Sequence, residues 1–276
     1  MSAIPNFFKN AVVALGVRPM ANKDAQWIGT GFIVGKKDPN DPRVTYLYLV
    51  TNRHVVINYK SMTVCVNKAD GTGVLHLSVN IYDLNGKPCC SMHPQRDVDV
   101  VAMELNASVL VNAKGQINWF DIDDHALTLA KMKQSGVDEG CLVYALGFPM
   151  GIVNQRIKAP FLRLGCISRI EDAFRGIGDS SYYVDAQTFP GNSGGPVVNR
   201  PANFTINGTP SNSSSNLIGI LSSYLPYREP LASRQTNEVM MVHRENSGLT
   251  KVFPVERIVE VVEMEFNRIH GNDLRR

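Results

Sequence analysis

The sequence lacks the features that are typical of disulfide-rich, zinc-binding, membrane and nucleic-acid-binding proteins. Five cysteines occur in 276 residues, without the regular spacing of a disulfide framework or of a paired C-x-x-C zinc site. No apolar run reaches the roughly 18 residues of a membrane-spanning helix. Charged residues make up 19%, and the net charge of +3 comes without a dense Lys/Arg tract. We therefore expect reduced thiols, no membrane partner and no nucleic-acid partner.

The N-terminus also lacks the marks of a secretory leader. The apolar stretch 7-FFKNAVVALGV-17 follows no basic segment, and no small-residue cleavage site comes after it. We expect a cytoplasmic protein without a signal peptide. The 44% share of apolar residues is ordinary for a globular chain, so a packed core rather than disorder is predicted.

Short β-rich runs bounded by turn residues recur along most of the chain. Typical examples are 44-VTYLYLVTN-52, 140-GCLVYALGF-148 and 217-LIGILSSYL-225. Almost no helical periodicity separates such runs, which favours an all-β sandwich or barrel. A polar stretch over residues 106–139 lies between two sets of strands. The predicted organisation is an N-terminal lobe over residues 1–125, a linker over 126–139 and a C-terminal lobe over 140–276.

One helix is predicted, at the C-terminus. In 254-PVERIVEVVEMEFNRI-269 the apolar residues Ile258, Val259, Val262 and Phe266 have helical spacing, and a proline stands at the first turn. We expect this amphipathic helix to pack on the second lobe.

The segment 188-TFPGNSGGPVV-198 surrounds Ser193 with three glycines. A serine hydroxyl is a poor nucleophile at neutral pH, so it needs a base to take its proton and a third group to orient that base. Among only six histidines, His54 is the best candidate base, because it comes directly after a strong strand that can hold the ring in place. The preferred acid is Asp99, which opens an apolar run, since Asp97 lies nearer the exposed end of the same strand face.

The serine segment also fits the nucleophile elbow of α/β-hydrolases, but that motif must run from the serine into a helix. Here Pro196 and the two valines after it continue as a strand. The only aspartate after Ser193 is Asp273, which lies beyond both remaining histidines, so only a glutamate could complete the Ser, acid, His order of those enzymes. We therefore disfavour an esterase of that fold.

Several motifs follow one another in the order seen in trypsin-like serine proteases. They are TGFIV, TNRHVV, DVDVVAMEL, LGFPMG, RLGCISRI, VDAQTFPGNSGGPVV, LIGILSS and GLTKVFPVERIV. The chain most closely resembles the protease domain of bacterial HtrA/Deg proteins, without a PDZ domain, over about residues 29–259. The resemblance implies an all-β, chymotrypsin-like fold of two antiparallel six-stranded β-barrels with a C-terminal helix.

The resemblance also implies residue roles. His54 would be the general base, Asp99 its orienting acid and Ser193 the nucleophile of an acyl-enzyme mechanism that needs no metal and no cofactor. The oxyanion hole would be formed by the backbone around Asn192, with N–H groups of Gly191 and Ser193 as donors. A side chain at Gly191 would obstruct the peptide orientation that brings its N–H to the developing negative oxygen.

Asn192 departs from the digestive members of the family. They carry an aspartate at this place, which pairs with a newly cut N-terminal amine, and an asparagine cannot form that ion pair. Activation by N-terminal cleavage is therefore not expected. The resemblance implies that the ordering of loops governs activity instead.

The resemblance further implies a substrate pocket. Its residues would be Gln187, Phe189, Ser222, Ser223, Tyr224 and Gly248. An aspartate in place of Gln187 would imply cleavage after arginine or lysine, so the sequence favours small or medium apolar residues at the cleavage site instead.

Three functional interpretations stay open at this point. The chain is interpreted first as a serine endopeptidase acting on protein or peptide substrates. It could instead be dormant until a partner protein switches it on, or be a catalytically silent binding module of the same fold. Three connections are longer than ordinary hairpin loops, at residues 171–180, 200–216 and 225–246. The last is either a tolerated surface insertion or a segment that covers the cleft and docks a partner.

Overall fold

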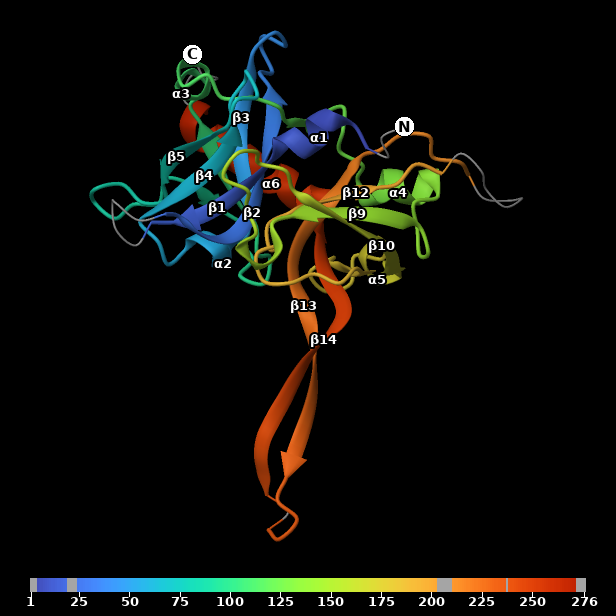
Figure 1. The fold of residues 1–276 in the computed structure, drawn as a ribbon. Coiled ribbons are helices and arrows are strands. Elements are labelled where there is room, and N and C mark those ends of the chain that lie inside the picture. Colours follow the sequence, from blue (N-terminus) through green and yellow to red (C-terminus); the bar gives the residue numbers. More distant parts are fainter. Residues whose placement is uncertain (1–3, 19–23, 203–209, 237, 272–276) are drawn as a thin grey trace.

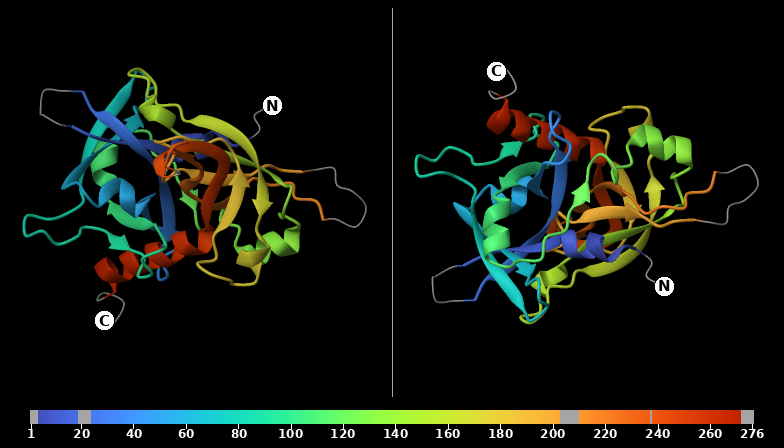
Figure 2. Two further views of the ribbon diagram at one scale, coloured as in Figure 1. Left: turned by 90° about the horizontal axis from the view of Figure 1, so that it is seen from below. Right: turned by 90° about the horizontal axis from the view of Figure 1, so that it is seen from above.

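Two β-sheets, built from successive parts of the chain, form the centre of the protein (Figure 1). The computed structural model describes residues 4–18, 24–202, 210–236 and 238–271. In the two views of Figure 2, the first sheet (blue to cyan) and the second (yellow to orange) lie side by side. The all-β, chymotrypsin-like fold expected from the sequence is confirmed.

The first sheet has the strand order β5-β4-β1-β2-β3-β7-β6, and β8 pairs in parallel with β2. It thus differs in detail from the expected six-stranded antiparallel barrel, because in the described part of the chain it has eight strands and its path does not close. The strands are β1 (Val12–Val17), β2 (Gln26–Lys37), β3 (Thr45–Thr51), β4 (Ser61–Asn67), β5 (Val74–Asn80), β6 (Ser91–Met92), β7 (Val101–Leu105) and β8 (Phe120–Asp121).

The second sheet closes into a six-stranded antiparallel barrel, as the sequence predicts, in the order β10-β11-β14-β13-β12-β9. Two of its strands are far longer than the others and continue out of the barrel as a hairpin (Figure 1). The strands are β9 (Leu142–Gly147), β10 (Phe161–Arg169), β11 (Tyr182–Asp185), β12 (Pro196–Asn199), β13 (Leu217–Ala232) and β14 (Val239–Pro254).

Short helices occupy the connections between strands. The region predicted as a linker contains one of them, α4, which Thr128 caps at its start and Gly136 ends in the left-handed conformation. Part of the predicted long loop 200–216, residues 203–209, lies outside the described residues. The helices are α1 (Asn6–Ala11), α2 (Arg53–Val56), α3 (Ala107–Asn112), η1 (Pro149–Gly151), α4 (Leu129–Ser135), α5 (Glu171–Phe174) and α6 (Val255–His270).

The C-terminal helix α6 packs on the second lobe, as expected, and it also packs on the first lobe, which was not predicted. It contacts β13 and β14 of the barrel, and also β6 and β7 of the first sheet. Several polar side chains of α6 bind partners in the first lobe. Glu265 accepts a hydrogen bond of 2.7 Å from Ser91, and His270 pairs with Glu104 at 2.7 Å.

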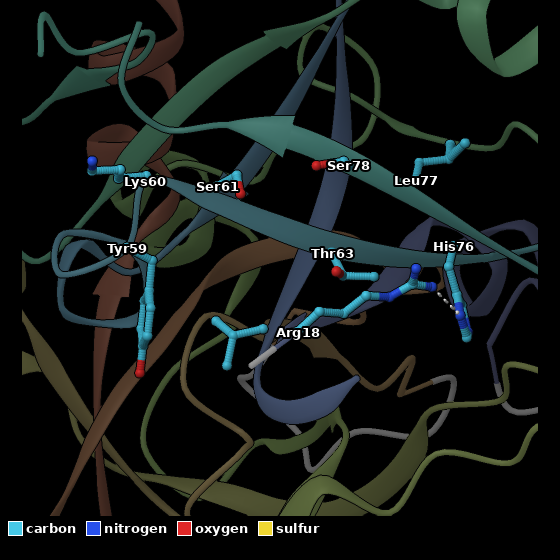
Figure 3. A pocket seen from close by; sticks show the side chains of 9 residues that line it. Arg18, Tyr59, Lys60, Ser61, Thr63, His76, Leu77 and Ser78 are labelled. Atoms are coloured by element: carbon cyan, nitrogen blue, oxygen red, sulfur yellow. Dashed lines mark hydrogen bonds between the residues drawn. The ribbon is translucent and has the colours of Figure 1, made fainter. Parts of the chain in front are cut away.

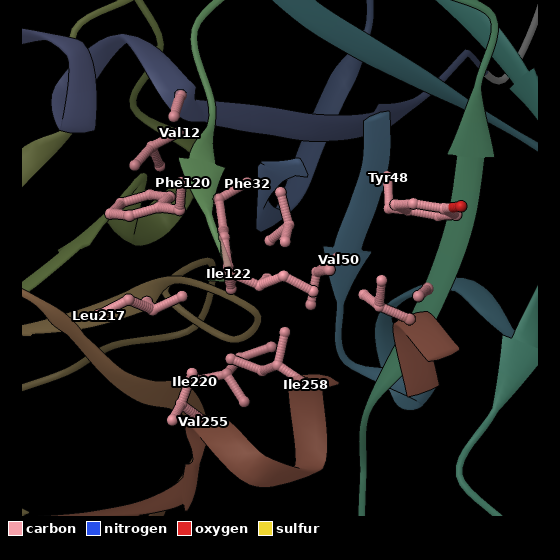
Figure 4. Close-up of a cluster of buried hydrophobic side chains, with 14 of the residues drawn as sticks. Val12, Phe32, Tyr48, Val50, Phe120, Ile122, Leu217, Ile220, Val255 and Ile258 are labelled. Atoms are coloured by element: carbon pink, nitrogen blue, oxygen red, sulfur yellow. The ribbon is translucent and has the colours of Figure 1, made fainter. Parts of the chain in front are cut away.

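One hydrophobic core runs through both lobes. Val12, Phe32 and Phe120 from the first part of the chain share it with Ile220 of β13 and Ile258 of α6 (Figure 4). All five side chains are fully buried. Burial of this kind contributes about 1.5–3 kcal/mol for each large apolar side chain, so the core fixes the position of the lobes relative to each other.

Candidate active site

His54 lies where β3 gives way to a single helical turn. The strand ends at Thr51, and α2 begins one residue before His54. Asn52, between the two elements, is fully buried and donates a hydrogen bond of 2.7 Å from its side chain to the carbonyl of Asp99. Arg53 donates to the carbonyl of His93. These bonds tie the turn that carries His54 to the loop that carries Asp99.

Asp99 holds His54 by two hydrogen bonds. Its Oδ1 accepts from the backbone N–H of His54 at 3.0 Å, and its Oδ2 lies 2.5 Å from His54 Nδ1. An ionised carboxylate can only accept, so the proton must sit on Nδ1, which leaves the lone pair of Nε2 free to accept another. Ser222 donates a further hydrogen bond of 3.2 Å to Oδ2 from the second lobe. The imidazole is thus held in the tautomer that a general base needs.

Ser193 sits in a tight turn that both lobes hold. Its carbonyl accepts from the backbone N–H of Thr30 in β2 at 3.0 Å, and the N–H of Gly194 donates to Leu221 of β13 at 3.0 Å. Gly194 has φ +84°, and a Cβ there would lie only 2.2 Å from the Thr30 carbonyl oxygen. Only glycine fits this place, because it accepts a positive φ and leaves the strands room to approach.

The backbone before Ser193 presents unpaired donors. Gly191 has φ +99°, its carbonyl accepts from Thr30 Oγ1 at 2.6 Å, and the carbonyl of Pro190 accepts from Met150 at 2.6 Å. Because the peptide is trans, the N–H of Gly191 points away from Met150. Among the described residues, neither the N–H of Gly191 nor that of Ser193 has a hydrogen-bond partner. The two groups remain available to a ligand.

A pocket of about 240 Å³ joins these parts. His54 and Ser193 both line it, and in the described part of the chain no hydrogen bond yet connects the two side chains. Among the described residues that line it, His54 is the one imidazole. The other lining residues are Thr188, Phe189, Pro190, Asn192, Leu221, Ser222, Ser223, Tyr224 and Thr250.

Two of the six predicted pocket residues do not line this pocket. Gln187 is exposed, whereas its neighbours Ala186 and Thr188 are buried. In an extended chain successive side chains point to opposite faces, so Gln187 points outward, and counting back from Ser193 could not reveal this. Gly248 is absent from the wall as well. The wall is instead braced by hydroxyls, since Thr188 and Thr250 share a hydrogen bond of 2.7 Å.

Sequence reasoning missed three residues that build the site. Thr30 binds Gly191 and Phe148, Asn52 binds Asp99, and Asn246 donates a hydrogen bond of 2.6 Å to the carbonyl of Thr188. Each acts on a residue far away in the chain. No local pattern of residue types could have identified them.

A second pocket, of about 300 Å³, lies on the first lobe and shares no lining residue with the first (Figure 3). Arg18 Nη2 lies 3.1 Å from Nδ1 of His76, and burial, followed by the charge of Arg18, lowers the pKa of His76. Lys60 points away from this pair. The charged groups of the pocket therefore do not converge on one ligand position.

Neither a metal cluster nor a membrane helix is found in the described ranges. No group of three or more His, Cys, Asp or Glu side chains lies close enough there to hold a metal ion. No helix there has the length and apolar character needed to cross a membrane.

Comparison with solved structures finds the same fold. The apo protease domain of MamO from Magnetospirillum magneticum matches with a TM-score of 0.50 and 16% identity, covering 92% of this chain and 96% of that one. The HtrA-type protease AlgW with a decapeptide matches with a TM-score of 0.48 and 15% identity. That match covers 94% of this chain and 65% of that one, less than two thirds of its length.

A family model matches the chain as well. Residues 29–204 match the model of the trypsin-like peptidase domain, and this range contains His54, Asp99 and Ser193. The match extends over more than half of the 276 residues. The chain belongs to the trypsin-like peptidase domain family.

Proposed function

We propose that the chain is a serine endopeptidase that hydrolyses peptide bonds of protein or peptide substrates through an acyl-enzyme. The observation that carries this proposal is the pairing of His54 with Asp99 at the edge of a pocket that Ser193 also lines. The pairing leaves His54 Nε2 as an acceptor, on a ring that lines the same pocket as the serine. A base in that state is what a serine hydroxyl needs to become a nucleophile.

In the first half of the reaction, Ser193 Oγ attacks the carbonyl carbon of the scissile bond while its proton passes to His54 Nε2. The carbonyl oxygen becomes an oxyanion, and the free N–H groups of Gly191 and Ser193 donate to it. One such donor contributes about 10²–10³-fold in rate. Asp99 stabilises the imidazolium. The C–N bond then breaks, His54 returns the proton to the leaving amine, and an ester on Ser193 remains.

In the second half, water replaces the amine. His54 takes a proton from the water as its oxygen attacks the ester carbonyl, and the same two N–H groups hold the second oxyanion. When the ester bond breaks, His54 gives the proton back to Ser193 Oγ. The carboxylic acid product leaves, and the enzyme returns to its starting state with atoms and charge balanced.

The pocket supports a preference for small or medium uncharged residues at the cleavage site. Its volume of about 240 Å³ is modest, and Leu221 and Tyr224 form part of its wall. Among the described residues, no carboxylate lines it to pair with arginine or lysine. A long cationic side chain would therefore lose its hydration there without gaining a counter-ion.

The test is covalent labelling of the purified chain with a fluorophosphonate probe, which reacts with an activated serine. Ser193→Ala and His54→Ala should each abolish rapid labelling. Ser168→Ala is the matched control, because Ser168 is an exposed serine of β10 outside the pocket, and it should label as the parent chain does. A folded parent chain that stays unlabelled would favour a silent binding module. Labelling that persists in Ser193→Ala would sink the proposed mechanism.

A further inference from the structure

The hairpin of β13 and β14 leaves the barrel and projects away from it (Figure 1). We call residues 225–246 the arm. Apolar side chains of the arm lie in water, with Met240 at 74% and Met241 at 62% of full exposure. An isolated two-stranded hairpin is marginally stable at best, and a contiguous exposed apolar surface marks an interaction site. The other exposed apolar side chains are Leu225, Tyr227, Leu231, Val239 and Val242.

The outer edge of β13 is closed to a further strand. Pro226 pairs with Asn246, and Pro230 pairs with Val242. A proline has no N–H, so neither pair can be one that exchanges backbone hydrogen bonds across the hairpin. The backbone of both prolines therefore faces the outer edge, where the missing N–H groups interrupt the row of donors. Proline placed in this way prevents an edge strand from pairing with another chain.

The outer edge of β14 is open, by the same reasoning. Because Val242 and Asn246 stand opposite the two prolines, their own N–H and C=O groups also point outward, and so do those of Arg244 between them. No proline occurs between Val239 and Asn246. Within the described part of the arm, the backbone N–H groups of Val242 and Arg244 find no partner outside the hairpin. A strand added here would meet a continuous row of donors and acceptors.

The charges of the arm indicate which kind of strand fits. Arg228 and Arg244 stand directly opposite each other, so they share one face of the hairpin. Like charges in this position repel. In the described part of the chain neither forms an ion pair. Glu229 and Glu245 lie on the other face, where Glu229 stands opposite His243 and Glu245 stands opposite Tyr227. A carboxylate brought in by a partner would relieve the repulsion.

A second copy of this chain fits the same edge poorly. Residues directly opposite in an antiparallel pair point to the same side of a sheet. Pairing two arms through β14 would therefore gather Arg228 and Arg244 of both copies on one face, with no acid on that face to offset them. The pattern favours a different polypeptide.

We propose that the arm is a docking site that adds a strand from another protein. The outer edge of β14, from Met241 to Glu245, would pair with an extended segment in which apolar residues alternate with aspartate or glutamate. The backbone of β14 supplies hydrogen bonds, and the arginine pair binds a carboxylate on one face of the hairpin. On the opposite face, Met241 and Leu231, which stand opposite each other, cover the apolar side chains. The site is separate from the proposed hydrolysis, so a binding measurement tests it independently.

The probe is a fluorescein-labelled peptide of about seven residues, a typical strand length, in which valine and glutamate alternate. Its fluorescence anisotropy is measured on the Ser193→Ala chain, so that hydrolysis cannot consume it. Val242→Pro should weaken binding at least about tenfold, since it removes an outward N–H and leaves the bonds inside the hairpin intact. Val242→Thr keeps that N–H and should bind nearly as the parent does. Arg244→Glu should weaken binding strongly.

Three results would overturn the proposal. The first is no saturable binding of the acidic peptide to a folded chain. The second is equal binding of a control peptide with lysine in place of glutamate, or equal binding by the Val242→Pro chain. The third is a dimer in light scattering that Val242→Pro dissolves, which would make a second copy the occupant. Fluorophosphonate labelling of Val242→Pro at the parent rate, on the background with Ser193 intact, shows that the variant is folded.

Discussion

The two lobes outside the arm, which we call the body, bury a lysine side chain. The arm, by contrast, leaves methionine and valine side chains exposed to water. Lys158 is 3% exposed, and its Nζ donates to the carbonyls of Asn10 at 2.7 Å and Val12 at 2.6 Å. Met240, by contrast, is 74% exposed. In each region the neighbours decide what is buried, and the polarity of the side chain is secondary. A charged group can be accommodated where acceptors converge, while an apolar group stays exposed where the chain provides nothing to cover it.

The change from buried to exposed side chains occurs within one strand, β13. The first six residues of β13 are all buried, and nearly all of the following ten are exposed. The change falls at Ser222 and Ser223, beside the pocket and at the point where the strand leaves the barrel. The same backbone thus serves as core, as pocket wall and as part of a free hairpin. Substitutions along it should have effects that fall steeply from the body to the arm.

The largest difference between substitutions in the body and in the arm should be seen in the rate of fluorophosphonate labelling. Asp99→Asn should lower the rate of fluorophosphonate labelling by about 10⁴-fold, because an amide that donates toward Nδ1 favours the wrong tautomer of His54. The matched change in the arm is Glu229→Gln, which faces His243 and should leave the rate unchanged. Labelling rates and thermal melting of both variants provide the measurement. A loss below about tenfold in Asp99→Asn would mean that His54 is oriented by something else.

The next difference should be seen in stability. Ile220 is fully buried in the core shared by both lobes, and Leu231 is 45% exposed in the arm. Ile220→Ala should lower the free energy of unfolding by about 2–5 kcal/mol, through lost burial and the cavity it leaves. Leu231→Ala should change it by less than about 0.5 kcal/mol. Urea unfolding of both variants measures the two values. Similar losses would show that the arm packs against the body in solution.

Short sequence patterns predicted the features that depend only on neighbouring residues in the chain. The turn around Ser193 and the strands on either side of it could be predicted because glycine, proline and β-branched residues specify backbone shape directly. The candidate acid Asp99 follows from the apolar run behind it. In the structure Val98 and Val100, on either side of Asp99, are fully buried. These features need no knowledge of distant parts of the chain.

Features that depend on distant contacts were not predicted. Residues 12–17 form β1, a central strand of the first sheet, although only an apolar patch could be recognised there from local patterns. The helix α6 was placed on one lobe because its apolar spacing says nothing about which surface covers it. Prolines at 226 and 230 obscured the strand in residues 225–232, since proline normally argues against a strand. The structure shows instead that both stand on a free edge.

The buried lysine yields the last prediction. Burial lowers the pKa of Lys158 to about 8 from its usual value of 10.5. Between these pH values the unfolded chain holds the proton and the folded chain has lost it, so the free energy of unfolding must rise with pH. The gain approaches about 3 kcal/mol by pH 10.5, at about 1.4 kcal/mol for each unit of pKa. The neutral amine can still donate to both carbonyls, so the local structure persists.

Two buried thiols act in the opposite direction over the same range. Burial raises the pKa of Cys65 to about 11 and that of Cys90 to about 12, so the unfolded chain releases these protons first and stability falls above about pH 9. Parent and Lys158→Met are both compared with Cys65→Ala in place, because Lys158 lowers the pKa of Cys65 and the loss of the lysine would change that thiol's contribution. Subtraction then removes the contribution of Cys90, which both chains retain. Urea unfolding from pH 7 to 10.5 should give a difference between parent and variant that grows with pH. A constant difference would show that water reaches the lysine and keeps its pKa normal.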